Sequence, residues 1–305
     1  MHIVVIGAGV VGLSCAVRLA EAGHAVEVVA AARATGTTSS VAAAIWYPYR
    51  AAPAAAVLRW TTATYAELVR LAARPGAGVA LVPGRELLRT AAPVPAWAAA
   101  VPDLAAVEQP PPGFAAGWSF TAPVADMPVY LAGLEARLLA AGGRLRVEHL
   151  TSLPDEPVLV DAAGLGAREL APDPSLSAVR GQVVLVEQPA VRRWSLDQSD
   201  PGRPVYVVPR TSCVVVGGTA DDGAEDLTPS SRTAEAVLER ATAVEPLLAG
   251  ARVLGHRVGL RPVRPAVRLE VEPTRSGRVV HCYGHGGAGV TLSWGCADDV
   301  LAALS

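Results

Sequence analysis

The sequence predicts an α/β protein in which a Rossmann-like domain of the GxGxxG type is interleaved with an α+β domain built on a mostly antiparallel sheet. Three observations support this fold class. A glycine-rich turn separates an apolar strand from an amphipathic helix at the start of the chain, and a second such turn precedes the last helix. Between them lie short β-branched runs bounded by turn residues, as in antiparallel sheets.

The elements follow from hydrophobic spacing and turn residues. The first thirty residues read as a strand, a turn from Gly7 to Gly12, a helix that Gly23 ends, and a second strand. Residues 74–128 are rich in Pro and Gly, which predicts loops with short strands. Strands are expected at 2–6, 25–30, 144–148, 158–161, 182–187, 205–208, 213–216, 253–259, 267–271 and 278–282, a polar loop at 34–40, and helices at 53–73, 129–141, 232–248 and the C-terminus.

Two interleaved domains account for this order, since no linker divides the chain and no internal repeat is present. We expect the first domain to comprise residues 1–50, 129–180 and 275–305. The second would comprise residues 51–128 and 181–274.

Composition excludes several classes of function. The 305 residues carry a net charge of −2 without long runs of one sign, so a nucleic-acid partner is not expected. All 26 basic residues are Arg. The absence of Lys excludes Schiff-base chemistry and the usual phosphate-binding loop of nucleoside triphosphatases.

The four cysteines stand singly in the sequence, at spacings that indicate neither a metal site nor a disulfide framework. No metal is therefore expected, and a reducing cytoplasm fits. The apolar N-terminal segment carries Arg18, Glu21 and Glu27, unlike a signal peptide, and no apolar run is long enough to span a bilayer. No membrane association is expected.

The first glycine-rich turn predicts a dinucleotide site, because it follows a strand and opens a helix. Glycines there permit close approach of the backbone to a pyrophosphate at the helix N-terminus. The acidic residue expected about twenty residues later is missing, since the second strand ends Ala30-Ala31-Ala32-Arg33. Arg33 could meet a phosphate or ribose oxygen instead, which leaves the type of dinucleotide open.

The second glycine-rich turn, Gly284 to Gly289, runs into a helix with few side chains to cover its backbone N–H groups. Such a turn suits a group that becomes anionic, as a flavin ring does on reduction. Its other interpretation is a tight strand-to-helix turn. His281 and His285 alone do not predict a metal site, because no third ligand is nearby in the sequence.

Two polar side chains on apolar strands are candidate substrate ligands. Arg268 alternates with Val267 and Leu269, and an Arg fixed on a strand can bind a carboxylate through two hydrogen bonds. Tyr206 stands within Pro204 to Pro209. Taken alone, such an Arg is more often part of a surface ion pair, and such a Tyr is more often a core residue with its hydroxyl hydrogen-bonded.

Together these segments resemble the D-amino-acid oxidase family of FAD enzymes over nearly the full length. The most specific matches are the Arg-Pro-Val-Arg-Pro stretch within 259–270 and the Tyr-Gly-His-Gly-Gly stretch within 281–295. The other matching segments are 7–14, 41–49 and 180–182.

The resemblance implies FAD as cofactor and a catalytic set in which Arg268 pairs with the substrate carboxylate, the Tyr206 hydroxyl assists, and the Gly287 carbonyl accepts from the amine. The residues that it implies at the cofactor are Gly7, Ala8, Gly9, Val10, Val11, Gly12, Arg33, Thr38, Ser39, Ala44, Ile45, Gly164, Gly286, Gly289, Val290 and Thr291.

Two departures from the family pattern stand out. Ser40 occupies a position where Asp is frequent. The segment from Asp197 to Arg203 contains no second Tyr, although eukaryotic members use one as a lid, so the lid is expected to be short or absent.

The implied reaction is hydride transfer from the α-carbon of a D-amino acid to FAD, giving a 2-oxo acid, ammonia and, with molecular oxygen, hydrogen peroxide. Neutral substrates are expected because no second basic group is clearly placed for D-aspartate. Glycine or sarcosine oxidation, an idle flavin-binding module and an NAD(P)-dependent dehydrogenase are the alternatives. The resemblance allows a homodimer, and the absence of a peroxisomal tripeptide at Leu301 to Ser305 favours the cytoplasm.

Overall fold

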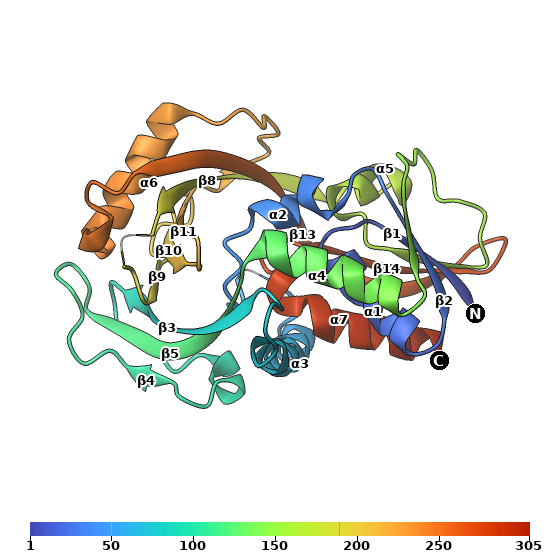
Figure 1. Ribbon diagram of the computed structural model, residues 1–305, viewed down its shortest axis with the longest axis horizontal. Coiled ribbons are helices and arrows are strands. Elements are labelled where there is room, and N and C mark those ends of the chain that lie inside the picture. Colours follow the sequence, from blue (N-terminus) through green and yellow to red (C-terminus); the bar gives the residue numbers. More distant parts are fainter. Residues whose placement is uncertain (50, 189) are drawn as a thin grey trace.

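A computed structural model describes residues 1–49, 51–188 and 190–305 (Figure 1). Its strands are β1 (His2–Ile6), β2 (Ala25–Ala30), β3 (Val79–Leu88), β4 (Ala105–Ala106), β5 (Ala116–Ala125), β6 (Arg144–Val147), β7 (Val158–Asp161), β8 (Ser177–Glu187), β9 (Trp194–Asp197), β10 (Val205–Pro209), β11 (Cys213–Gly217), β12 (Asp221–Asp222), β13 (Val253–Pro273) and β14 (Arg278–His285). Its α-helices are α1 (Val10–Glu21), α2 (Thr38–Val41), α3 (Ala54–Ala72), α4 (Met127–Ala140), α5 (Ala167–Leu170), α6 (Ser231–Val244) and α7 (Gly289–Leu304).

One half of the molecule is a parallel sheet covered by helices. Strands β14, β7, β1, β2 and β6 lie side by side in this order, and each neighbouring pair is parallel. Helices α1, α4 and α7 lie together along this half, where both chain ends are also found (Figure 1). Apolar side chains of these helices pack with those of β1 and β2 in one buried core. The expected Rossmann-like unit is therefore confirmed.

The other half is mostly antiparallel. From β13 the sheet continues through β8, β11, β10 and β9 in antiparallel pairs, then through the parallel pair β9 and β3 to β5 and β4. Helix α6 packs on this sheet through Ala234, Val237, Ala241 and Val244, which join a second buried cluster with β8, β10 and β11. The predicted α/β fold class is thus confirmed in both parts.

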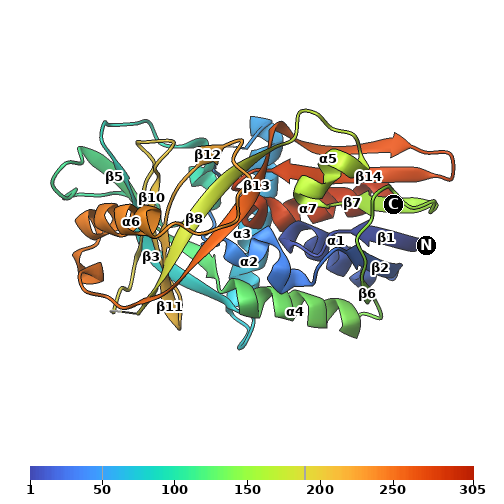
Figure 2. The ribbon, with the colours of Figure 1, turned by 90° about the horizontal axis from the view of Figure 1, so that it is seen from above.

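Strands β8 and β13 connect the two halves. They pair antiparallel along most of their length and run together from one end of the molecule towards the other (Figure 2). The last part of β13 leaves β8 and pairs with β14 instead. Side chains on this one strand therefore reach both halves.

Two expectations drawn from the sequence are wrong, one for β13 and one for residues 74–128. The strands expected at 253–259 and 267–271 are one strand, β13, whose pairing with β8 runs to Val263, where its pairing with β14 begins. The register with β14 is irregular between Val263 and Arg268. Residues 74–128 hold two paired ten-residue strands, β3 and β5, rather than short pieces. Tertiary pairing overrides the local turn signals there.

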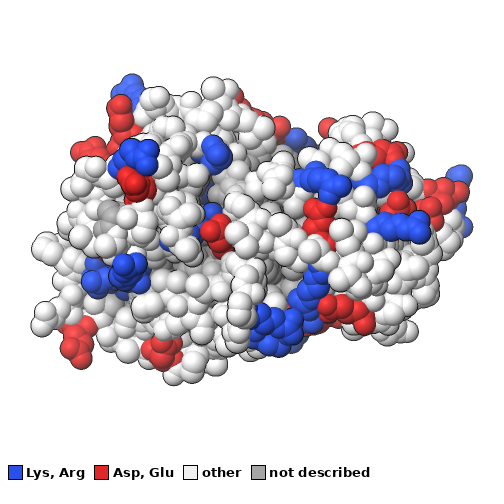
Figure 3. Space-filling model, viewed as in Figure 1, with Lys and Arg blue, Asp and Glu red and all other residues white. Residues whose placement is uncertain are grey.

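The surface carries mixed charge. On the face in Figure 3, basic and acidic groups lie beside one another in several places. Ion pairs such as Arg137 with Glu21 and Arg146 with Glu27 account for part of this pattern. Within the described residues, no helix is long and apolar enough to cross a membrane. The expected domain boundaries stay a prediction, and the one at Arg50 lies outside the described residues.

Replacing Gly12 with Ala tests the packing of α1 against the first turn. A Cβ at Gly12 would lie 2.0 Å from the Gly7 carbonyl oxygen, so helix and turn would have to separate. We expect Gly12→Ala to lower the free energy of unfolding by about 1–3 kcal/mol in chemical denaturation. The control is Gly133→Ala in α4, where a Cβ meets nothing within 4 Å. Replacing Gly with Ala inside a helix stabilises it by about 0.5–1 kcal/mol, so Gly133→Ala should raise the free energy of unfolding. Equal effects of the two substitutions would contradict the packing argument.

Candidate functional site

Three loops meet at the carboxyl ends of adjacent parallel strands. They follow β1, β7 and β14, which are neighbours in the sheet. Such a position in an open α/β sheet is where ligands bind. A cavity of about 470 Å³ lies there and extends to β10 and β13 of the antiparallel half.

The first loop is shaped by the lack of a side chain at Gly7. Its φ of +110° is unfavourable for other residues, and a Cβ would lie 2.4 Å from the carbonyl oxygen of Ala162, in the loop after β7. The two loops therefore touch backbone to backbone. This contact leaves the space above the strand ends open.

Two long helices point their N-termini at the cavity. Neither α1 nor α7 has a side-chain N-cap at the residue before its first turn. The Val10 N–H of α1 donates instead to the Ser39 hydroxyl at 2.9 Å. Gly289 and Val290 at the start of α7 line the cavity. Exposed N–H groups at a helix N-terminus attract anions, so both ends of the cavity suit negative charge.

Most residues that the sequence analysis assigned to the cofactor line this cavity. The lining set is Gly7, Ala8, Gly9, Val10, Val11, Thr38, Ser39, Ala44, Ile45, Gly164, Gly286, Gly289 and Val290, joined by Tyr206 and Gly287. Their individual roles stay predictions.

Three of the cofactor residues lie elsewhere. Gly12 packs against Gly7 beneath the loop. Arg33 is 60% exposed, pairs with Glu135 of α4 and does not line the cavity, so its place near the adenosine half stays a prediction. Thr291 exchanges hydrogen bonds with the backbone of Tyr47, its hydroxyl accepting from N–H at 3.1 Å and donating to C=O at 2.9 Å. It fixes Tyr47 rather than facing the cavity.

Tyr206 and Arg261 form the polar end of the cavity in the antiparallel half. A Cβ at Gly217 or Gly218 would lie 2.4 Å or 2.6 Å from the Tyr206 hydroxyl oxygen, so this pair of glycines makes room for the side chain. Burial raises the pKa of Tyr206, while the charge of Arg261 and a hydrogen bond with it act in the opposite direction. The hydroxyl therefore stays protonated at neutral pH.

Arg261 reaches the cavity because Gly181, its diagonal neighbour on β8, has no side chain. A Cβ at Gly181 on β8 would lie 2.4 Å from the guanidinium. The Arg261 Nη1 donates to the Thr219 carbonyl at 3.0 Å. In the described part of the chain, Arg261 forms no ion pair with a carboxylate, and it is the one Asp, Glu or Arg side chain in the cavity lining. Its positive charge is left for a ligand.

The expectation that Arg268 binds substrate is wrong, because this side chain lies outside the cavity. It is opposite Tyr283 on β14, and its guanidinium binds the carboxylates of Glu270 at 2.6 Å and Glu272 at 2.8 Å. Residues two and four positions along a strand share a face, which explains this ladder. Arg268 also donates to the Tyr283 hydroxyl at 2.7 Å.

Tyr283 links Arg268 to a buried carboxylate. Its hydroxyl donates to Asp173 at 3.0 Å, and Arg264 pairs with the same oxygen at 2.8 Å. Burial opposes ionisation of Asp173, but hydrogen bonds from Ser175, Arg264 and Tyr283 outweigh it and lower the pKa to about 2. This network anchors the end of β14, from which the third loop starts.

A second polar link, missed in the sequence, lies on the cavity wall. Tyr47 lines the cavity beside Gln198, and its hydroxyl donates at 2.6 Å to Glu86 of β3. Glu86 is 8% exposed, and burial raises its pKa. Tyr47 and Tyr49 in the sequence indicate an aromatic wall of the cavity, which both residues line, but nothing near Glu86 in the sequence marks its link to Tyr47.

The segment between β9 and β10 is short. Asp200 accepts hydrogen bonds from the backbone N–H groups of Gly202 and Arg203 and pairs with the Arg203 side chain at 2.8 Å. Arg203 is 70% exposed and does not line the cavity. These contacts agree with the expected absence of a long lid.

The histidines of the last strand differ in their surroundings. His281 faces Asp161 at 3.4 Å and Glu272 at 3.2 Å. His285 instead lies with Cys282 and Cys296, a group that the scattered cysteines of the sequence did not suggest.

Comparison with known proteins agrees with this geometry. The family described as FAD dependent oxidoreductase matches residues 2–304. A D-amino-acid oxidase of Rubrobacter xylanophilus is 50% identical over 98% of this chain and 94% of its own length. A human D-aspartate oxidase is 37% identical over 100% of this chain and 94% of its own length. The crystal structure of glycine oxidase from Geobacillus kaustophilus shares the fold, with a TM-score of 0.80 at 19% identity over 98% of this chain and 93% of that one.

Replacing Asp173 with Asn tests the network behind the third loop. The pKa of about 2 lies below the ordinary 3.8, so the carboxylate stabilises the fold above pH 3.8, and this contribution is lost as pH falls through about 2. We expect Asp173→Asn to lower the free energy of unfolding at pH 7 by about 1–2 kcal/mol, with a smaller difference near pH 2. The control is Asp222→Asn on exposed β12. A pH-independent difference would contradict this assignment.

Proposed function

We propose, since the chain belongs to the FAD-dependent oxidoreductase family, that it catalyses the oxidative deamination of D-amino acids. The products are the 2-oxo acid formed from the hydrolysed imino acid, ammonia and hydrogen peroxide. The chemistry that bound FAD supplies is acceptance of a hydride from the α-carbon, with molecular oxygen as the final electron acceptor. The remaining tasks are binding, orientation and exclusion of water, and they belong to this chain.

The residues around the cavity fit FAD. The glycine at position 7 keeps the first loop free of side chains, and the N-terminus of α1 suits a pyrophosphate. Ala30, Ala31 and Ala32 line the cavity after β2, so small residues leave room for the adenosine half. The loop Gly286 to Gly289 and the N-terminus of α7 suit the pyrimidine edge of the flavin.

One observation carries the assignment of an amino-acid substrate: Arg261 presents an unpaired positive charge inside the cavity. A guanidinium fixed by the Thr219 carbonyl and flanked by the Tyr206 hydroxyl is suited to a carboxylate. Because the pKa of Tyr206 is raised, its hydroxyl donates a hydrogen bond to that carboxylate.

The handedness of the substrate follows from three contacts. The carboxylate binds Arg261 and Tyr206, the amine lies near the Gly287 carbonyl, and the α-hydrogen is directed at the flavin. Tyr49 packs against Gly287, where a Cβ would lie 2.7 Å from its ring, so this backbone position is crowded on one side. No side-chain base is required for hydride transfer once the amine is neutral.

Neutral side chains fit this cavity better than acidic ones. After Arg261 binds the α-carboxylate, the described lining offers no second Arg for a side-chain carboxylate. Glu86 lies behind Tyr47 and would repel an anionic substrate when ionised. We therefore favour neutral D-amino acids over D-aspartate. The buried, unpaired cysteines support a reducing compartment such as the cytoplasm.

The anaerobic visible spectrum tests the reaction. We expect the purified chain to be yellow and to be bleached by D-alanine or D-valine but not by the L-forms. Bleaching by glycine or sarcosine alone would favour a related amine oxidase, and no bleaching by any amine would indicate a module that only binds flavin.

Replacing Arg261 with Ala tests the carboxylate site. Removing one partner of a buried charge pair costs roughly 2–5 kcal/mol, so we expect a large rise in KM for D-alanine. Arg268→Ala is the matched control, because it removes the same charge from the same strand outside the cavity. Steady-state kinetics should leave KM of that variant near the wild-type value. A larger KM effect at Arg268 would sink the assignment of Arg261.

Adding a cation to the cavity wall tests the substrate preference. We expect Gln198→Arg to raise kcat/KM for D-aspartate relative to D-alanine about tenfold, equivalent to about 1.4 kcal/mol. Ser199→Arg adds the same charge one residue further, on an exposed position outside the cavity lining. If both variants changed the ratio equally, the effect would be long-range and the cavity wall would not set specificity.

A further inference from the structure

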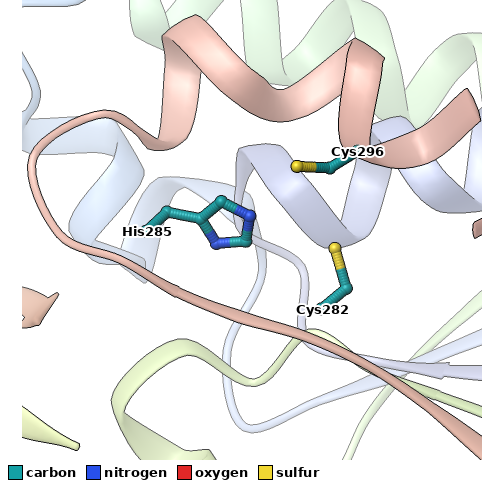
Figure 4. A group of neighbouring side chains, drawn as sticks. All are labelled: Cys282, His285 and Cys296. Atoms are coloured by element: carbon teal, nitrogen blue, oxygen red, sulfur yellow. The ribbon is translucent and has the colours of Figure 1, made fainter. Parts of the chain in front are cut away.

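Three potential metal ligands meet behind the loop that follows β14. Cys282 lies within β14, His285 is the last residue of that strand, and Cys296 lies on α7. Their ligand atoms all lie within 4.8 Å of one another. Figure 4 shows the imidazole and the two sulfur atoms around a common space.

This group is buried and has an unsatisfied member. Cys282, His285 and Cys296 are 1%, 4% and 0% exposed. The His285 Nε2 is buried without a hydrogen-bond partner. Buried polar atoms are nearly always paired, so an orphaned imidazole nitrogen beside two thiols needs an explanation. A metal ion bound to that nitrogen would supply one.

The two thiols and the imidazole supply three protein ligands. Zn²⁺ sites with three protein ligands complete their tetrahedron with a water molecule or another small ligand. Cys282 and His285 line the large cavity, so water can reach the fourth position.

We propose that Cys282, His285 and Cys296 bind one Zn²⁺ ion. Thiolate and neutral imidazole are the ligands that soft or borderline metals prefer. Binding displaces the thiol protons to solvent while the metal–sulfur bonds form, and no electron is transferred.

The ion has a route to the site. Cys282 and His285 line the large cavity, whereas Cys296 lies behind them. Zn²⁺ can therefore approach through the cavity before FAD covers it. The inference does not depend on the proposed oxidase activity, because these side chains belong to the packing between β14 and α7.

The test is metal retention by the full-length chain. The FAD-free protein is exposed to Zn²⁺ under reducing conditions, dialysed and measured by elemental analysis, and Co²⁺ is used separately as a spectroscopic probe. We expect about one metal ion per chain and the visible spectrum of tetrahedral thiolate coordination. Cys296→Ser should lower retention at least tenfold.

Cys213→Ser is the matched control, since Cys213 is a buried free cysteine on β11 outside the group. It should retain metal as the unchanged chain does. Cys296→Ala and a thermal unfolding curve for each variant separate loss of the ligand from loss of the fold. No retained metal in the unchanged chain, or equal retention in Cys296→Ser and Cys213→Ser, would overturn the site.

Discussion

The contact between the backbones of the loops after β1 and β7 is the constraint on which the rest of the site depends. A Cβ added at Gly7 would lie 2.4 Å from the carbonyl oxygen of Ala162, and a Cβ added at Gly12 would lie 2.0 Å from the carbonyl oxygen of Gly7. Only without these side chains can β1, β7 and the N-terminus of α1 converge. Because β14 is the neighbour of β7 in the sheet, the loop that follows β14 closes the third side of the crevice. The crevice is therefore a consequence of backbone packing, and its helix termini face whatever fills it.

Strand β13 joins this crevice to the antiparallel half. Its first part pairs with β8 and carries Arg261 opposite Val179, whereas its last part pairs with β14 and carries Arg268 opposite Tyr283. The register changes between Val263 and Arg268. One strand thus delivers one arginine to the cavity and another to the network of Asp173, Tyr283 and Glu272, which anchors the loop above.

The glycine-rich turns and the Rossmann-like order of elements could be predicted from the sequence, because they rest on local spacing. The resemblance to a family, rather than spacing, singled out Tyr206, which lines the cavity. The choice between Arg261 and Arg268 could not. Both alternate with apolar neighbours, and the space that admits Arg261 is made by Gly181 on another strand. The pairing of Arg268 with Glu270 and Glu272 can be predicted only once the strand, and therefore the face that these side chains share, is known. The group around Cys282 depends on contacts between β14 and α7, which no ligand spacing in the sequence reveals.

The absence of lysine is consistent with this way of binding anions. Each long helix presents about half a positive charge at its N-terminus, without the cost of desolvating a full ammonium ion. The uncapped start of α7 lines the cavity, and Arg261 lies close to the loop that precedes this helix, since a Cβ at Gly287 would lie 3.6 Å from the Arg261 Cδ. Neither backbone N–H groups nor a guanidinium lose their positive character near neutral pH, whereas a buried lysine would. The cavity therefore keeps a positive potential fixed by the fold, and the one full charge within the described lining is left to select the carboxylate.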